Sequence, residues 1–248
     1  MKIIGITGPS GSGKSRISAM LREHGYPVID VDVVARELRP KYSGKVKEVF
    51  GKDYINDDGS INTRKLALLV FNNRSALAKL NEFVFPAVME EMRKIIEEYR
   101  AKPDIEFLFF DIAVLFHSGA EKFFDQIVLI TAPRLTRLER LIKLRKTAMD
   151  VAIAQVDSVF ITHDEINRCN LILVNDGDEK DVHAKLLEWI NKIKVGSNDM
   201  SKITPVSPIS TKVDINPESR NRDLQKKHKE EFSEKLQKAI KDKKKLEK

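Results

Sequence analysis

The sequence predicts an α/β fold in which helices flank a five-stranded parallel sheet, and three observations lead to this expectation. Five short, continuous apolar runs recur along the chain, as expected for strands that are covered on both faces. Helical patterns between them supply the crossovers that parallel strands need. The first run leads directly into a glycine-rich loop. The expected strands are 3–7, 27–31, 106–111, 126–131 and 170–174, and the expected helices are 15–24, 63–99, 133–146 and 179–193.

The segment between the second and third strands is too long for a plain crossover, and a tight turn at Asp58-Gly59 interrupts it. It predicts a helical insertion at about residues 35–103, placed over the carboxyl ends of the strands. In a nucleotide kinase, the substrate that accepts the phosphate would bind there. From residue 196 the chain is polar and contains prolines without an apolar period, which predicts a disordered or partly helical tail over 196–248.

The net charge of +7 is concentrated in that tail. Residues 197–248 carry 14 Lys/Arg against 9 Asp/Glu, which leaves 30 against 28 for the rest of the chain. A basic pI alone favours a nucleic-acid partner, but the body offers no basic stripe with interleaved aromatics, and the tail mixes both signs of charge. The composition therefore argues against nucleic acid as a partner.

We expect a cytoplasmic protein. No run approaches the roughly 18–20 apolar residues of a membrane span, and no signal-peptide pattern is present. The single cysteine, Cys169, excludes an internal disulfide and fits a reducing compartment. Its side chain is expected to be a small buried apolar group. The sequence leaves the oligomeric state open.

Residues 8–15, GPSGSGKS, match the phosphate-loop pattern G-x-x-x-x-G-K-[ST] between a strand and a helix. Glycines let successive backbone N–H groups turn inward around an anion, and the helix start adds partial positive charge. Lys14 would reach the β- and γ-phosphates, and the Ser15 hydroxyl would bind Mg²⁺. The pattern predicts a nucleoside triphosphate as the donor and Mg²⁺ as a cofactor, and it leaves the choice between ATP and GTP open. The expected nucleotide-binding residues are Gly8, Ser10, Gly11, Ser12, Gly13, Lys14, Ser15 and Arg16.

The second strand runs into VIDVDVVARE, which places Asp30 and Asp32 two residues apart. A carboxylate beside a phosphate loop is costly unless it serves Mg²⁺ or the acceptor. An alcohol is a poor nucleophile at neutral pH and needs a positioned base, whereas a phosphate acceptor is already ionised. Asp32 therefore favours a hydroxyl acceptor, and the alternative is that it caps the next helix.

At this point a family resemblance becomes visible. Over about residues 1–193 the chain resembles the dephospho-CoA kinase family, whose members use ATP to phosphorylate the 3′-hydroxyl of dephospho-CoA in coenzyme A biosynthesis. The resemblance implies a P-loop kinase domain over residues 1–195, with a short lid at about residues 137–156 and a small-molecule acceptor. It rests on GITGPSGSGKS, VIDVDVVAR, DGSINTRKLALLVF, LNEFVFP, FLFFDIAVLF and NLILVNDGD, in that order.

The resemblance also implies roles for individual residues. Asp32 would be the base, Asn175 would lie near the adenine, and Asp111 would be a second carboxylate of the metal site. The acceptor side would include Thr7, Arg36 and Arg64, and the lid arginines would come from residues 137–145, with Arg140 as the catalytic one. Structural alternatives stay open: a surface position for Arg64, solvated Arg137, Arg140 and Arg145, a turn role for Asn175 and a cap for Asp111.

Two departures from the family pattern fall where the acceptor should lie. Phe85-Pro86 stands where the family has His-Pro, and His117 replaces an acidic residue. We expect both as acceptor contacts, although His117 could also be a polar residue at the edge of a strand.

Two other functions stay open. A nucleoside monophosphate kinase would use Arg36 and Arg64 to clamp the acceptor phosphate. A nucleotide-binding regulator would bind the nucleotide without transferring its phosphate to an acceptor.

Overall fold

The computed structural model describes residues 1–157, 161–177 and 179–195. The tail expected at residues 196–248 lies outside this part of the chain.

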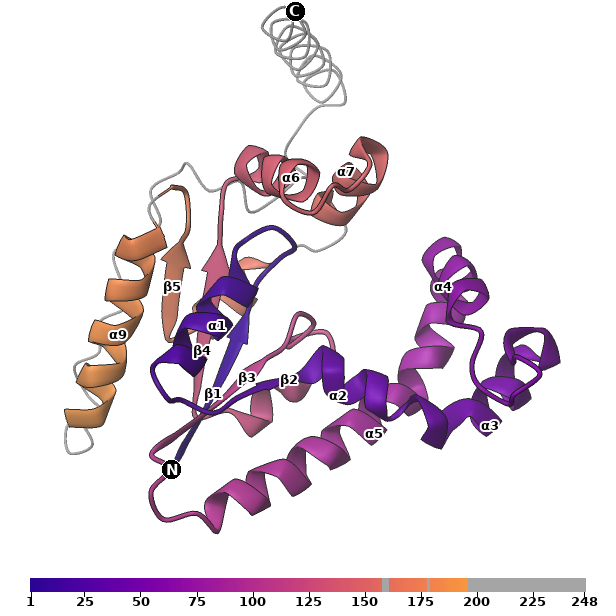
Figure 1. Ribbon diagram of the computed structural model, residues 1–248, viewed down its shortest axis with the longest axis horizontal. Coiled ribbons are helices and arrows are strands. Elements are labelled where there is room, and N and C mark those ends of the chain that lie inside the picture. The colour runs from indigo at the N-terminus through magenta and orange to yellow at the C-terminus, as the bar shows by residue number, and fades with distance from the viewer. Residues whose placement is uncertain (158–160, 178, 196–248) are drawn as a thin grey trace, which may run out of the picture. The chain divides into compact units, whose positions relative to one another are not determined.

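The sheet has five parallel strands in the order β2-β3-β1-β4-β5, which confirms the predicted fold class (Figure 1). Ile6 of the central strand is aligned with Asp111 on one side and Val128 on the other. Because the strands are parallel, their carboxyl ends meet at one edge of the sheet. The strands are β1 (Lys2–Thr7), β2 (Val28–Asp30), β3 (Phe107–Asp111), β4 (Gln126–Thr131) and β5 (Leu171–Val174).

Helices cover both faces of this sheet (Figure 1). Successive side chains of β3 alternate between two buried clusters, as side chains of a strand must. Phe107 and Phe109 pack with α1 (Lys14–Glu23) and α9 (Glu179–Val195). Leu108 and Phe110 pack with α2 (Val31–Glu37) and α5 (Arg74–Arg100). Burial on both faces explains why the strands read as continuous apolar runs.

The insertion after β2 is helical and has a small core of its own. It contains α2, α3 (Arg39–Phe50), the 3₁₀ turn η1 (Lys52–Tyr54), α4 (Thr63–Asn72) and α5. The helical stretch expected over 63–99 is two helices, because the Asn73 side chain accepts a 3.0 Å hydrogen bond from the Ala76 N–H and caps α5. The core residues are Val46, Ile61, Leu66, Val70 and Ala76.

Two helices follow β4 and form a hairpin beside the phosphate loop: α6 (Arg134–Lys143) and α7 (Met149–Asp157). Arg134 at the start of α6 donates two hydrogen bonds, of 2.8 and 2.7 Å, to the Asp157 carboxylate at the end of α7. This pair ties the open ends of the hairpin together. The remaining elements are η2 (Ala120–Phe123) and α8 (His163–Asn167).

Within the described ranges, no helix combines the length and the apolar character that crossing a membrane requires.

Candidate active site

The glycine-rich loop joins the end of β1 to the start of α1. Gly13 precedes α1 with a left-handed φ of 98° and offers no side-chain cap, so the first N–H groups of the helix are left for another acceptor. A Cβ on Gly8 would lie 2.0 Å from the backbone oxygen of Ile130, so no larger residue fits there. Ser10 is half-buried, Ser15 is exposed, and the Ser12 hydroxyl is buried without a hydrogen-bond partner among the described residues.

Lys14 is held against the carboxylate of Asp111 at the end of β3. Its Nζ forms an ion pair with Asp111 Oδ1, while Ser18 donates a 2.6 Å hydrogen bond to Asp111 Oδ2. Burial lowers the pKa of Lys14, whereas the charges of Asp32 and Asp30 raise that pKa and the charge of Arg145 lowers it. Asp111 is therefore a partner of the loop lysine and not a helix cap. Sequence reasoning missed Ser18, although its spacing of four from Lys14 places both on one helix face.

Asp30 and Asp32 have different positions at the start of α2. Asp30 is the N-cap, and its Oδ1 accepts hydrogen bonds from the Asp32 N–H at 3.0 Å and the Val33 N–H at 3.2 Å. The capping role considered for Asp32 thus belongs to Asp30. Asp32 lies in the first turn of α2 with its side chain exposed. Its carboxylate is therefore not committed to holding the backbone.

Asp32 lines an open pocket between α2, α5 and the segment after β3, with about 430 Å³ of empty space that includes its solvent-open mouth. Phe85 lies in the same pocket, so these two expected acceptor residues come together. Asp32 is the ionisable residue among the lining side chains, and nearly all the others are apolar. They are Val31, Ala35, Val84, Phe85, Val88, Met92, Ile112, Val114, Ser118 and Ala120.

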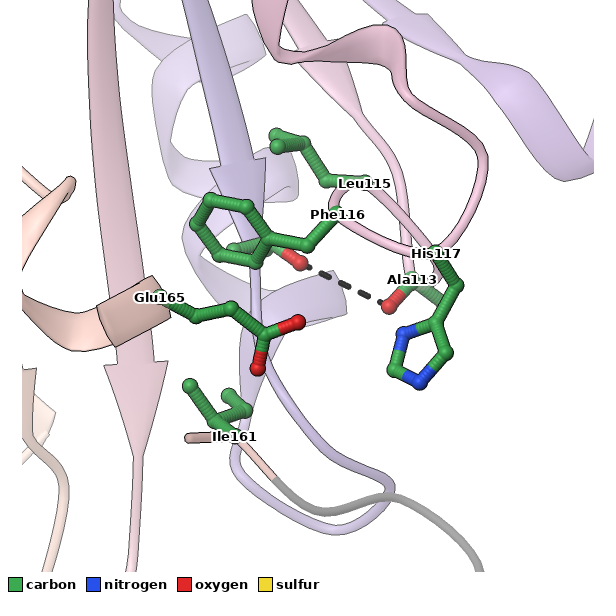
Figure 2. Close-up of a pocket in the computed structure, with 7 residues that line it drawn as sticks. Ala113, Leu115, Phe116, His117, Ile161 and Glu165 are labelled. Atoms are coloured by element: carbon green, nitrogen blue, oxygen red, sulfur yellow. Dashed lines mark hydrogen bonds between the residues drawn. The ribbon is translucent and has the colours of Figure 1, made fainter. Parts of the chain in front are cut away.

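Thr7 and His117 line a second, smaller pocket. Figure 2 shows it between the segment after β3 and α8, with the Glu165 carboxylate and the His117 imidazole on opposite sides. Thr7 Oγ1 lies 3.5 Å from the Ala113 carbonyl oxygen, to which it donates a long hydrogen bond. Glu165 was not expected here. It also accepts hydrogen bonds from Thr162 as part of the cap of α8.

The two acceptor-side arginines lie apart from these pockets. Arg36 is exposed one turn after Asp32 on α2, and Arg64 is the exposed second residue of α4. Neither belongs to the lining of the two pockets just described.

The lid arginines differ in their surroundings. Arg137 is buried, with 8% of its surface exposed, and its Nη1 donates a 3.3 Å hydrogen bond to the Val156 carbonyl, so the solvated alternative is wrong for this residue. Burial lowers the pKa of Arg137, and the charge of Arg134 lowers it further. Arg140 is half-buried, and its Nη1 lies 3.4 Å from the carbonyl oxygens of Gly11 and Ser12. Arg145 is exposed.

Two nucleotide-side residues remain, Asn175 and Arg16, and they differ in burial and in partners. Asn175 follows β5 and has 3% of its surface exposed. Its Nδ2 donates a 2.9 Å hydrogen bond to the Ser12 carbonyl, and its Oδ1 accepts a 3.1 Å bond from Arg140. Arg16 forms a surface ion pair with Glu179 at the start of α9.

A phosphate loop after the central strand of a parallel sheet, with its lysine opening the next helix, defines a P-loop nucleotide-binding protein of the α/β class. The family model for dephospho-CoA kinase matches residues 2–181 of the chain. The chain therefore belongs to the dephospho-CoA kinase family, a family of ATP-dependent kinases.

Individual relatives agree with this assignment. A protein named dephospho-CoA kinase from Bacillus cereus is 35% identical over 188 residues, which cover 74% of this chain and 93% of the relative. One of the same name from Carboxydothermus hydrogenoformans is 32% identical over 198 residues, covering 78% and 95%.

Solved structures show the same fold. The structure of TT1252 from Thermus thermophilus is 29% identical with a TM-score of 0.65, covering 77% of this chain and 97% of that chain. Dephospho-CoA kinase from Campylobacter jejuni, at 21% identity and a TM-score of 0.59, covers 78% and 98%.

Proposed function

We propose that this chain transfers the γ-phosphoryl group of ATP to the 3′-hydroxyl of dephospho-CoA. The observation that carries the proposal is the placement of Asp32. Its carboxylate lies at an apolar pocket and is free of the capping role that Asp30 takes. Burial lowers the pKa of Lys14, and the negative charge of Asp32 partly opposes that lowering. A base beside the phosphate-binding lysine is what a hydroxyl acceptor requires.

The proposed reaction begins with an exchange of partners at Lys14. When the nucleotide binds, Lys14 leaves Asp111 and contacts the β- and γ-phosphates, where it offsets charge that develops during transfer. Asp32 orients the acceptor hydroxyl and accepts its proton. Residues 137–156 act as the lid, and Arg140 from this lid spreads the charge on the transferred group. An Arg140 guanidinium has five N–H donors, so its contacts with loop carbonyls leave others for phosphate.

The donor set of the site fits Mg²⁺. Ser15 offers a hydroxyl and Asp111 a carboxylate, both hard oxygen ligands. Among the described residues there is no group of three His, Cys, Asp or Glu side chains that could hold a metal ion. This agrees with an ion held by one or two protein ligands, water and substrate phosphates. When bound, Mg²⁺ would neutralise charge on the β- and γ-phosphate oxygens.

On the acceptor side we propose that Phe85 packs against the substrate near Asp32. Thr7 and His117 would contact it from the second pocket, and Arg36 and Arg64 would attract its diphosphate from solvent. We also propose that the protein works in the cytoplasm, where a single free cysteine such as Cys169 stays reduced.

An acceptor panel tests the proposed reaction. The purified full chain is incubated with ATP, Mg²⁺ and either dephospho-CoA or each ribo- and deoxynucleoside monophosphate, and ADP release is measured. We expect turnover with dephospho-CoA and a product heavier by one phosphoryl group. Turnover confined to a monophosphate would replace this proposal with a nucleoside monophosphate kinase. Nucleotide binding without turnover on any acceptor would favour a regulator.

Asp32→Asn tests the base directly. We expect kcat to fall at least ~10²-fold, the size of a general-base contribution, with little change in the affinity for ADP. Asp164→Asn is a matched control, because Asp164 is also exposed and also occupies the second position of a helix, α8. A near-normal kcat for Asp32→Asn, or an equal loss in both variants, would show that Asp32 is structural.

A further inference from the structure

The Asn175 side chain connects three parts of the molecule that are far apart in sequence. Its backbone N–H extends the sheet by a 2.7 Å hydrogen bond to the Thr131 carbonyl. Its amide nitrogen bonds to the Ser12 carbonyl in the phosphate loop, and its amide oxygen accepts from Arg140 in α6. One amide therefore bridges the sheet edge, the phosphate loop and the lid hairpin.

This amide is engaged at both ends and closely surrounded. Only 3% of the Asn175 surface is exposed, and a Cβ on Gly13 would lie 2.2 Å from Asn175 Nδ2. A contact with the adenine base, which the family resemblance implies, would compete with both existing hydrogen bonds. The geometry is that of a group that faces the loop.

The orientation of one peptide unit explains what such a contact achieves. In a planar trans peptide the C=O and the following N–H point in opposite directions. Asn175 and Arg140 both approach the Ser12 carbonyl oxygen. The Gly13 N–H is therefore directed away from them, which is how a phosphate nest needs its donors arranged.

We propose that Asn175 is a positioning residue for the donor phosphates: it holds the Ser12 carbonyl outward, thereby aims the Gly13 N–H at phosphate, and seats Arg140 beside the loop. The proposal rests on the phosphate loop as the donor site and does not depend on which acceptor is used. It predicts that Asn175 acts on the phosphates of the nucleotide and not on its base.

Two titrations of Asn175→Ala separate these roles. The full chain is titrated by calorimetry with ADP and with inorganic tripolyphosphate, without any acceptor. We expect both dissociation constants to rise by the same factor, about tenfold for one hydrogen bond of typical strength. A residue that reads adenine would weaken ADP binding alone and leave tripolyphosphate unchanged. That result, or no change for either ligand, would overturn the proposal.

Asn170→Ala is the matched control. Asn170 lies immediately before β5, at the end of this strand opposite to Asn175. Its Oδ1 accepts a 2.8 Å hydrogen bond from the Ile127 N–H in β4. We expect the affinities of Asn170→Ala for ADP and for tripolyphosphate to be those of the unchanged protein. An equal loss in Asn170→Ala would mean that any loosening of β5 weakens the site, and would also overturn the proposal. If Asn175→Ala does not fold, Asn175→Ser serves in the same titrations, because it also removes the carboxamide that bonds to Ser12 and Arg140.

Discussion

The close approach of Gly13 to Asn175 allows a quantitative test of the loop geometry. Gly13 has a φ of 98°, and an added Cβ would lie 2.2 Å from Asn175 Nδ2. Gly25 after α1 has a similar φ of 82°, but nothing lies within 4 Å of its added Cβ. Gly13→Ala therefore combines backbone strain with a steric clash, whereas Gly25→Ala introduces the strain alone.

The expected costs follow from these two terms. An L-residue in the left-handed region costs about 1–2 kcal/mol at either position. At Gly13 the added methyl must also displace the Asn175 amide and break its bond to the Ser12 carbonyl. A buried donor or acceptor that loses its partner costs about 1–3 kcal/mol. We expect unfolding free energies to fall by about 1 kcal/mol in Gly25→Ala and about 3 kcal/mol in Gly13→Ala.

A double-mutant cycle isolates the clash. In an Asn175→Ala background the obstructing amide is gone, so Gly13→Ala should cost only about 1 kcal/mol of strain. The assay is urea unfolding followed by the fluorescence of Trp189, the single tryptophan, which is buried in α9. Equal costs of Gly13→Ala in the two backgrounds would refute the reasoning, since the clash would then play no part.

Two further predictions concern the half-buried Cys169 and the buried Arg137. Burial and the charge of Glu165 raise the pKa of Cys169 to about 12, so its thiolate fraction at pH 8 is ~10⁻⁴. Alkylation of Cys169 by iodoacetamide, followed by mass spectrometry, should therefore be far slower in the folded chain than in the urea-unfolded chain. Equal rates in the two states would contradict this prediction. Arg137→Met should lower the unfolding free energy by about 1–3 kcal/mol, because the Val156 carbonyl loses the hydrogen bond that Arg137 donates. Its kcat should fall if Arg137 serves the phosphates, and an unchanged kcat would restrict it to packing.

Local patterns were enough to predict the sheet and the phosphate loop. Strands buried on both faces must be apolar throughout, and the loop motif is contiguous from Gly8 to Ser15. Both patterns can therefore be recognised in the sequence without knowledge of distant contacts. The prediction was less accurate where a single side chain decides a boundary. Asn73 divides one expected helical stretch into α4 and α5, because its carboxamide caps the second helix.

The acceptor residues illustrate a different limit. Asp32 and Phe85 are 53 positions apart by their numbers, and they meet because α2 and α5 pack on the same face of the sheet. Arg36 and Arg64 stand on exposed helix surfaces outside the two pockets. A motif places a residue on an element, but it does not give the direction in which that element faces its neighbours.

By itself, the sequence determined the parallel α/β sheet, the phosphate loop and the family resemblance, because each is written in consecutive residues. Only the tertiary structure decided which groups hold the loop. Lys14 pairs with Asp111 across 97 positions, and Asn175 bonds to the Ser12 carbonyl across 163. These contacts arise because all five strands are parallel, which brings the carboxyl ends of β3 and β5 to the edge of the sheet where β1 opens into the loop.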